Sequence, residues 1–207
     1  MASAIIHLAV AKELLKRIKV DNQYDYYLGS IAPDIAKQIG ISRDDSHFIK
    51  NTFNGIPNIA LFKQRYPNVT DYSFNVGYFT HLYTDKIWIE EFLPNYTSNN
   101  SIRLLNGTIL ETTEEEIKQL LYSDYTNLNV QLIEEYDMDL SLFYEPFKMP
   151  YTTIEEIPVE KLDILINKMG IIIANSKPDS TYTLDLSSIK EFIEKCVNEI
   201  EKELINY

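Results

Sequence analysis

Apolar residues recur along most of this 207-residue chain at steps of three and four positions, the period of an α-helix that buries one side. The spacing predicts a first helix that is capped by Ser3 and extends to about Lys19. A second helix is expected to begin near Tyr24 and to break at Pro33, because proline has no amide hydrogen to donate. The segment 40–58 carries the Gly, Asn, Ser and Pro residues of an irregular connection.

The same period predicts the rest of the chain to be helical. Further helices are expected at about 58–66, 70–93, 112–136, 158–175 and 185–205. Only "STYTLDL", residues 180–186, alternates like a strand, and we interpret it as a short extended connector. The pattern therefore predicts an all-α protein, a single-domain multi-helix bundle of about seven helices spanning residues 1–207.

Charge and cysteine content narrow the possible partners and the compartment. The formal net charge is −12, which repels the phosphates of nucleic acid and of anionic membranes, so we expect no nucleic-acid partner. No apolar run is long enough to cross a bilayer, and no stable membrane insertion is expected. The lone Cys196 lies in an apolar helical stripe and is interpreted as a core residue. With no disulfide possible and no apolar leader that resembles a secretory signal, the sequence favours a cytoplasmic protein.

The candidate chemistry lies in two carboxylates and two histidines from four separated positions. His81 and Asp85 are four residues apart in "GYFTHLYTD" and so share one face of the helix over 70–93. Asp34 directly follows the break at Pro33, and His47 lies in "DDSHF". Two imidazole nitrogens and two carboxylates form a ligand set that suits a divalent ion such as zinc. Each residue alone also fits a hydrogen-bonded core position, but a dication would offset the several kcal/mol that buried unpaired carboxylates cost.

Four segments resemble one known family. The stretches "HLAVAKELL", "YYLGSIAPDI", "SHF" and "GYFTHLYTD", all within about residues 3–92, are similar to the helical zinc-dependent phospholipase C family, whose fold is similar to that of the single-strand-specific zinc nucleases. The resemblance implies that Asp34, His47, His81 and Asp85 bind one zinc ion. It also implies that His7 helps to bind a second zinc ion, with Asp85 bridging the two.

The chain departs from the family in two places. The extracellular enzymes complete the second site with an N-terminal tryptophan, whereas this chain begins Met1-Ala2-Ser3 and is expected to have no leader to remove. They also bind a third zinc ion through later histidines, and no histidine follows His81 here. Asp124 is the best candidate to replace those ligands, although a polar role at the edge of its helix fits equally. Glu90 and Glu91 are weaker candidates because they lie near a helix end.

The resemblance implies a metal-dependent hydrolase of phosphodiester bonds, with one or two divalent ions and with Asp34 as a general base besides its ligand role. We expect a small soluble phosphodiester or a phospholipid head group as the substrate. Tyr78 and Trp88 could line the substrate site, although both also fit a core role. The alternatives are a non-catalytic helical module that is braced by a structural metal, and a non-heme iron protein using the same nitrogen and oxygen ligands.

Overall fold

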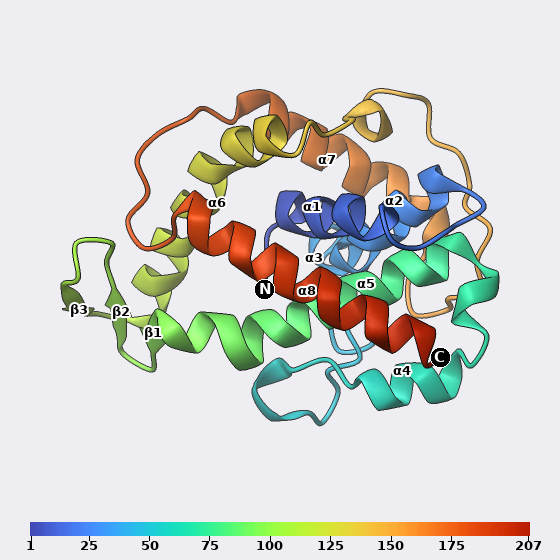
Figure 1. The fold of residues 1–207 in the computed structure, drawn as a ribbon, viewed down its shortest axis with the longest axis horizontal. Helices are drawn as coiled ribbons and strands as arrows, with labels where there is room; N and C mark the ends of the chain where they lie inside the picture. Colours follow the sequence, from blue (N-terminus) through green and yellow to red (C-terminus); the bar gives the residue numbers. More distant parts are fainter.

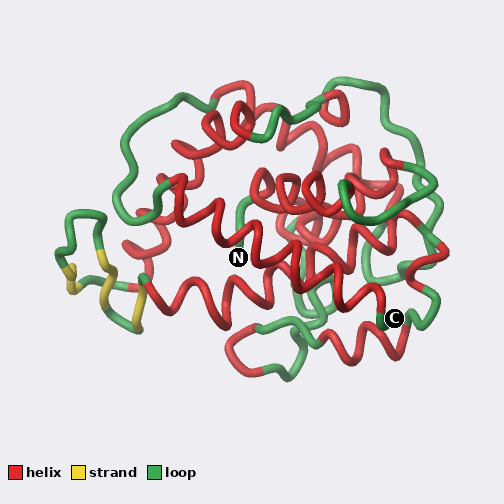
Figure 2. The backbone as a smooth tube through the Cα atoms, in the orientation of Figure 1, coloured by secondary structure: helices red, strands yellow, loops and turns green.

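A computed structural model describes residues 1–207 as a helical bundle (Figure 1). Helices dominate the backbone and the only strands form a small hairpin sheet at one end (Figure 2). The α-helices are α1 (Ala4–Leu15), α2 (Gln23–Ile31), α3 (Ile35–Ile39), α4 (Ile59–Arg65), α5 (Ser73–Ile87), α6 (Glu114–Glu135), α7 (Leu162–Asn175) and α8 (Leu186–Ile205). The all-α prediction is confirmed, with seven longer helices and the five-residue α3, which the sequence did not predict.

Side-chain caps fix where most helices begin. Ser3 accepts the amide of Ile6 at 3.3 Å, as predicted. Thr113 forms a reciprocal capping box with Glu116, and Asp185 caps α8. These side chains satisfy amides of the first turn that have no helical partner, and so they set the register of the apolar stripes.

The predicted break at Pro33 is also found. α2 ends at Ile31, and a 3-10 turn, η1 (Ala32–Asp34), leads into α3. Asp34 therefore lies at a junction between two helices, where its side chain is held in one direction. The helix that was predicted over 70–93 is found as α5, which is followed by a π-helical turn over Trp88–Phe92.

A small sheet is the feature that differs from the sequence pattern. Strands β1 (Thr97–Ser98), β2 (Ser101–Arg103) and β3 (Ile109–Glu111) form an antiparallel sheet in which neighbouring strands pair in sequence order. The sequence did not predict them because they are only two or three residues long. Residues 180–185 form the connector before α8, as interpreted from the sequence, and the amides of 182–184 bond to the carboxylate of Asp124.

Helices α2 and α5 pack with their backbones in close contact through two glycines. A Cβ atom added to Gly77 would overlap the carbonyl oxygen of Tyr26 and would lie 2.8 Å from the amide nitrogen of Ser30. Gly29 meets the backbone of Phe74 in the same way. This close approach places the end of α2 next to the middle of α5, the segment that carries the predicted HxxxD pair.

One hydrophobic cluster of 44 buried residues extends from Ala2 to Ile200. α1 lies in the middle of the bundle, and α8 packs across α1 and α5 on the side nearest the viewer in Figure 1. α3 lies behind α1 in the same view. No helix is both long and apolar enough to cross a membrane.

Candidate metal centre

Five of the predicted ligands converge in the interior of the bundle. His7 comes from α1, Asp34 from the end of η1, His47 from the loop over 40–58, and His81 and Asp85 from α5. All five are buried. Their ligand atoms form two overlapping groups, one of His7, His81 and Asp85 and one of Asp34, His47 and His81, with the atoms of each group within 4.8 Å of one another.

The spacing of the donor atoms is that of ligands around one metal ion. The Nε2 atoms of His47 and His81 are 3.3 Å apart. His47 Nε2 lies 3.6 Å from Asp34 Oδ1, and His81 Nε2 lies 3.7 Å from Asp85 Oδ2. A tetrahedral zinc ion with Zn–N bonds of about 2.0–2.1 Å places its ligand atoms roughly 3.3–3.4 Å from one another. The donor set therefore matches the edges of such a coordination shell in kind and in spacing.

Each of the two imidazoles, His81 and His47, has a polar partner at its Nδ1 atom, so that its Nε2 atom points toward the centre. His81 Nδ1 donates to the carbonyl of Ser30 at 2.9 Å, which places the ring proton on Nδ1. His47 Nδ1 lies 2.8 Å from Ser46 Oγ, and either atom of this pair can be the donor. His81 Nε2 therefore directs a lone pair at the centre, 3.3 Å from His47 Nε2, and is available to a cation there.

Several polar atoms at the centre have no hydrogen-bond partner although they are fully buried. They include both ring nitrogens of His7, Oδ1 of Asp34 and Oδ2 of Asp85. Buried polar atoms are nearly always satisfied in proteins, so a group of unsatisfied atoms facing one space indicates a missing ligand. Since all of these atoms are nitrogen or carboxylate oxygen, the ligand that they fit is a metal ion.

Asp85 lies between the two groups of ligand atoms. Its Oδ1 lies 3.4 Å from His7 Nε2 and accepts the amide of Ala2 at 3.1 Å. Its Oδ2 lies 3.7 Å from His81 Nε2 and 3.9 Å from His47 Nε2. The rings of His7 and His81 stack with centroids 3.8 Å apart. A carboxylate with one oxygen toward each group is placed as a bridging ligand would be.

Burial and local charge keep the ligands in the forms that bind metals. Burial, aided by the neighbouring His7, lowers the pKa of His81 to about 3, so its ring is neutral at neutral pH. Burial likewise lowers the pKa of His47. For Asp34, burial alone would raise the pKa, but the contact with His47 and the nearby imidazoles outweigh it and leave the pKa at about 2. The same balance, with His7 as the neighbour, lowers the pKa of Asp85.

Asp124 does not join this cluster. It is fully buried on α6, and its two oxygens accept the amides of Tyr182, Thr183 and Leu184 at 2.7–2.8 Å. Its carboxylate thus closes the loop before α8 and has no free oxygen directed at the other ligands. The costly burial that made Asp124 a metal candidate is offset by backbone amides rather than by an ion.

Replacing Asp124 with Asn is expected to destabilise the protein without changing its metal content. An amide has one acceptor oxygen where the carboxylate has two, and its NH₂ group would face backbone donors. Bonds to a charged acceptor contribute about 1.5–3 kcal/mol, so we expect the free energy of unfolding to fall by ~2–4 kcal/mol in urea. Metal analysis of the same sample is the matched test, and loss of metal together with unchanged stability would contradict this role.

Tyr78 and Trp88 lie in the core, which is the alternative to a substrate-site role that the sequence left open for both. Both are fully buried. The hydroxyl of Tyr78 donates to the carbonyl of Ser46, and its ring stacks on Phe62, so Tyr78 supports the loop that carries His47. Trp88 packs against aromatic rings, including Phe192 at 5.0 Å between centroids. Neither side chain lines the pocket beside the centre.

Glu90 and Glu91 pair with lysines at the surface. Glu90 binds Lys86 at 2.8 Å, and Glu91 binds Lys195. Their exposure agrees with their position near the helix end.

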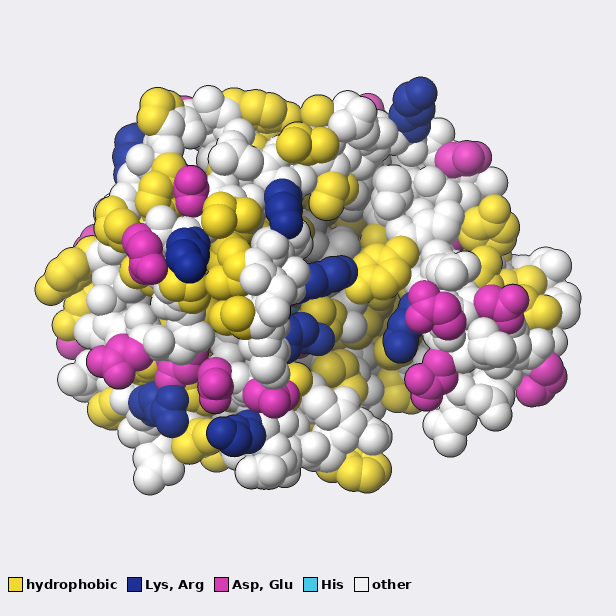
Figure 3. Space-filling model, turned by 180° about the vertical axis from the view of Figure 1, so that it is seen from behind, with side chains coloured by type: hydrophobic (Ala, Val, Ile, Leu, Met, Phe, Trp, Pro, Cys, Tyr) yellow, Lys and Arg dark blue, Asp and Glu magenta, His cyan; other side chains and the backbone are white.

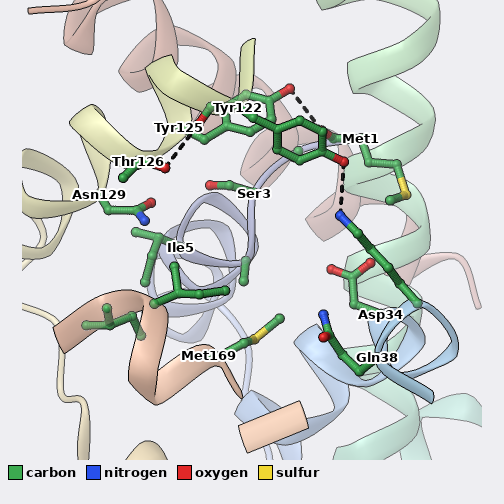
Figure 4. Close-up of a pocket in the computed structure, with 15 residues that line it drawn as sticks. Met1, Ser3, Ile5, Asp34, Gln38, Tyr122, Tyr125, Thr126, Asn129 and Met169 are labelled. Atoms are coloured by element: carbon green, nitrogen blue, oxygen red, sulfur yellow. Dashed lines mark hydrogen bonds between the residues drawn. The ribbon is translucent and has the colours of Figure 1, made fainter. Parts of the chain in front are cut away.

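A pocket of about 320 Å³ opens beside the cluster (Figure 4). Asp34 and Gln38 lie on one side, and Tyr122, Tyr125 and Asn129 lie on another. α7 contributes an apolar wall of Met169, Ile172 and Ile173. Asp34 is the cluster residue that lines this pocket, and it therefore connects the buried centre with the outside.

The residues that orient the ligands, and the cations beside them, were not predicted from the sequence. Ser30, Ser46, Arg43 and Lys37 were not singled out. Ser46 directly precedes His47, so that neighbour was visible in "DDSHF". Ser30 acts through its carbonyl, which carries no sequence signal.

The comparison with known proteins agrees with this geometry. The model of a family described as zinc dependent phospholipase C matches residues 6–127, which is more than half of the chain and includes all five clustered side chains. No curated protein and no solved structure gives a significant match to the chain.

Proposed function

The chain belongs to the zinc-dependent phospholipase C family, and from that premise we propose that its buried cluster binds one or two divalent ions, zinc by family, and hydrolyses phosphodiester bonds. The observation that carries the proposal is the convergence of buried imidazole nitrogens and carboxylate oxygens in two overlapping groups, in which the His47 and His81 Nε2 atoms are 3.3 Å apart. A divalent ion at this position would polarise the phosphoryl oxygens and lower the pKa of a bound water molecule.

Asp34 is the residue to which we assign the general base. It is ionised at neutral pH, since its pKa lies at about 2. About 12 % of its side chain is exposed, whereas those of His47, His81 and Asp85 are 0 % exposed. A carboxylate at the boundary between the cluster and the pocket can accept a proton from the attacking water and release it to solvent.

The pocket supports a substrate with a phosphate at one end and an apolar part at the other. Its polar end is at Asp34, and its apolar wall is on α7. Its volume of about 320 Å³ lies at the small end of the range for small-molecule sites, ~300–1,000 Å³. These features favour a phospholipid head group with the adjoining glycerol, or a small soluble phosphodiester. Because Cys196 is buried and has no partner cysteine, we keep a reducing compartment, the cytoplasm, as the expected location.

Replacing Asp34 with Asn should abolish hydrolysis of a chromogenic phosphodiester. Loss of a positioned general base costs roughly 10²–10⁴-fold in rate, and the lost ligand charge adds to that effect. Turnover by the zinc-loaded wild type would be compared with that of Asp34→Asn and of the exposed control Asp21→Asn. Equal turnover by Asp34→Asn would refute the assigned role.

The rival account is a metal that only braces the bundle. Complete burial of His47, His81 and Asp85 favours it, because structural zinc sites are closed. It predicts that the wild type binds metal and is stabilised by it but hydrolyses no phosphodiester. A non-heme iron centre would be recognised by iron instead of zinc in the purified protein.

A further inference from the structure

Arg43 lies at the edge of the metal centre with much of its binding capacity unused. Its Nη2 atom is 3.8 Å from Asp85 Oδ2, which is too long for a hydrogen bond. Its Nε atom is buried and has no partner. The side chain is 30 % exposed although Asp85 is 0 % exposed. The backbone bond from the His47 amide to the Arg43 carbonyl, at 3.0 Å, fixes both residues in one turn of the loop.

Lys37 is a second cation on the pocket side. It follows Asp34 by three residues and lines the same pocket. Its Nζ donates to the hydroxyl of Tyr122 at 3.0 Å and lies 4.6 Å from the centre of that ring. Both of these contacts are with an uncharged partner, Tyr122. On the face seen in Figure 3, Lys and Arg side chains gather around a central hollow, although the whole chain carries a net charge of −12.

The charges at the centre do not balance without an anion. Asp34 and Asp85 carry two negative charges, which a single divalent ion neutralises. Arg43, whose ion-pair partner is that same Asp85, and Lys37 then add two positive charges, and a second ion would increase the excess. Guanidinium groups bind phosphate through paired N–H groups, and the unpartnered Nε of Arg43 leaves such a pair available.

We infer that Arg43 and Lys37 form an oxyanion-binding pair that holds the phosphate group of the substrate against the metal centre. This inference rests on the proposed function. The family's third zinc ion is bound by later histidines, and no histidine follows His81 here. In this chain, Arg43 and Lys37 supply positive charge instead. A cation at the mouth also disfavours a substrate with a quaternary ammonium group, so the pair selects phosphate esters whose other substituent is neutral or anionic.

The test is calorimetric titration of inorganic phosphate and of glycerol 3-phosphate into the zinc-loaded wild type, Arg43→Gln and Lys37→Gln. Each variant should bind both probes at least about tenfold more weakly, because each loses one charged donor. The exposed Arg103→Gln, which removes the same charge elsewhere, should bind like the wild type. Zinc content and thermal unfolding are measured on the same samples, so that a variant that fails to fold or to hold metal is recognised, and the other variant then decides.

Four results separate the possible outcomes. Unchanged phosphate affinity in both variants, with normal zinc content, would overturn the pair while leaving the proposed function intact. A wild type that binds phosphate but no zinc would contradict the proposed function, and weaker binding by the variants would still support the pair. Retention by vesicles of phosphatidylcholine with phosphatidic acid, lost in both variants, would assign the anion to a lipid head group. Tight binding of glycerol 3-phosphate without vesicle retention would assign it to a soluble ester.

Discussion

Replacing Asp85 with Asn is expected to remove the stabilisation that metal gives to the protein. Asp85 contacts both groups of ligand atoms, with Oδ1 toward His7 and Oδ2 toward His81. A ligand present at ~1,000 times its dissociation constant stabilises the native state by about 4 kcal/mol. Chelation of the wild type should therefore lower its free energy of unfolding by about that amount. Chelation of Asp85→Asn should change it little, because an amide cannot supply the bridging charge.

For each variant, the free energy of unfolding is compared between the metal-loaded and the chelated protein. Any other effect of the substitution on stability is present in both samples and cancels. Urea unfolding gives both free energies for each variant. Asp25→Asn is the matched control, since Asp25 is also a buried aspartate but accepts the amide of Tyr151 and lies outside the cluster. Asp25→Asn should keep the full response to chelation. A full response in Asp85→Asn would place the metal elsewhere.

Replacing Gly77 with Ala is the second change with a large expected effect. The added methyl group would overlap the carbonyl oxygen of Tyr26 and press on the amide of Ser30, both of which are backbone atoms of α2. Backbone cannot rotate away as a flexible side chain can, so α2 and α5 must move apart. We expect a loss of about 3 kcal/mol or more, at the upper end of what overpacking costs. The movement would also stretch the bond from His81 to the Ser30 carbonyl and so weaken metal binding.

Gly170→Ala provides the control for Gly77→Ala. Gly170 also lies within a helix, but a Cβ there would meet Phe143 at 3.5 Å, an ordinary contact. Alanine is favoured over glycine in a helix by about 1 kcal/mol, so this variant should be as stable as the wild type or more so. Urea unfolding of both variants measures the difference. Equal stability of Gly77→Ala and wild type would mean that α2 and α5 are not in close backbone contact.

The elements that the sequence predicted are those with local signals. Ser3 is a helix cap with a local effect, and Pro33 breaks a helix whatever surrounds it. The spacing of His81 and Asp85 guaranteed a common face on α5. Their convergence with His7, from α1, depends on tertiary packing, and the family resemblance rather than the spacing indicated it.

The features that the sequence did not predict depend on partners far along the chain. The role of Asp124 depends on amides about sixty residues later. Tyr78 was a candidate for the substrate site because it lies beside the HxxxD pair, yet its hydroxyl binds the carbonyl of Ser46. Gly77 appeared only as a neighbour of His81, and nothing in the sequence showed that it faces the backbone of α2. Backbone carbonyls and amides as partners leave no trace in side-chain patterns.

The most direct test of the account is the metal content of protein purified without added metal, by inductively coupled plasma mass spectrometry. The wild type is predicted to carry one or two zinc ions per chain, and His81→Ala and Asp34→Asn, if folded by circular dichroism, to carry far less. A folded wild type with no bound transition metal, or equal zinc in all three proteins, would show that the buried histidines and aspartates form no metal centre.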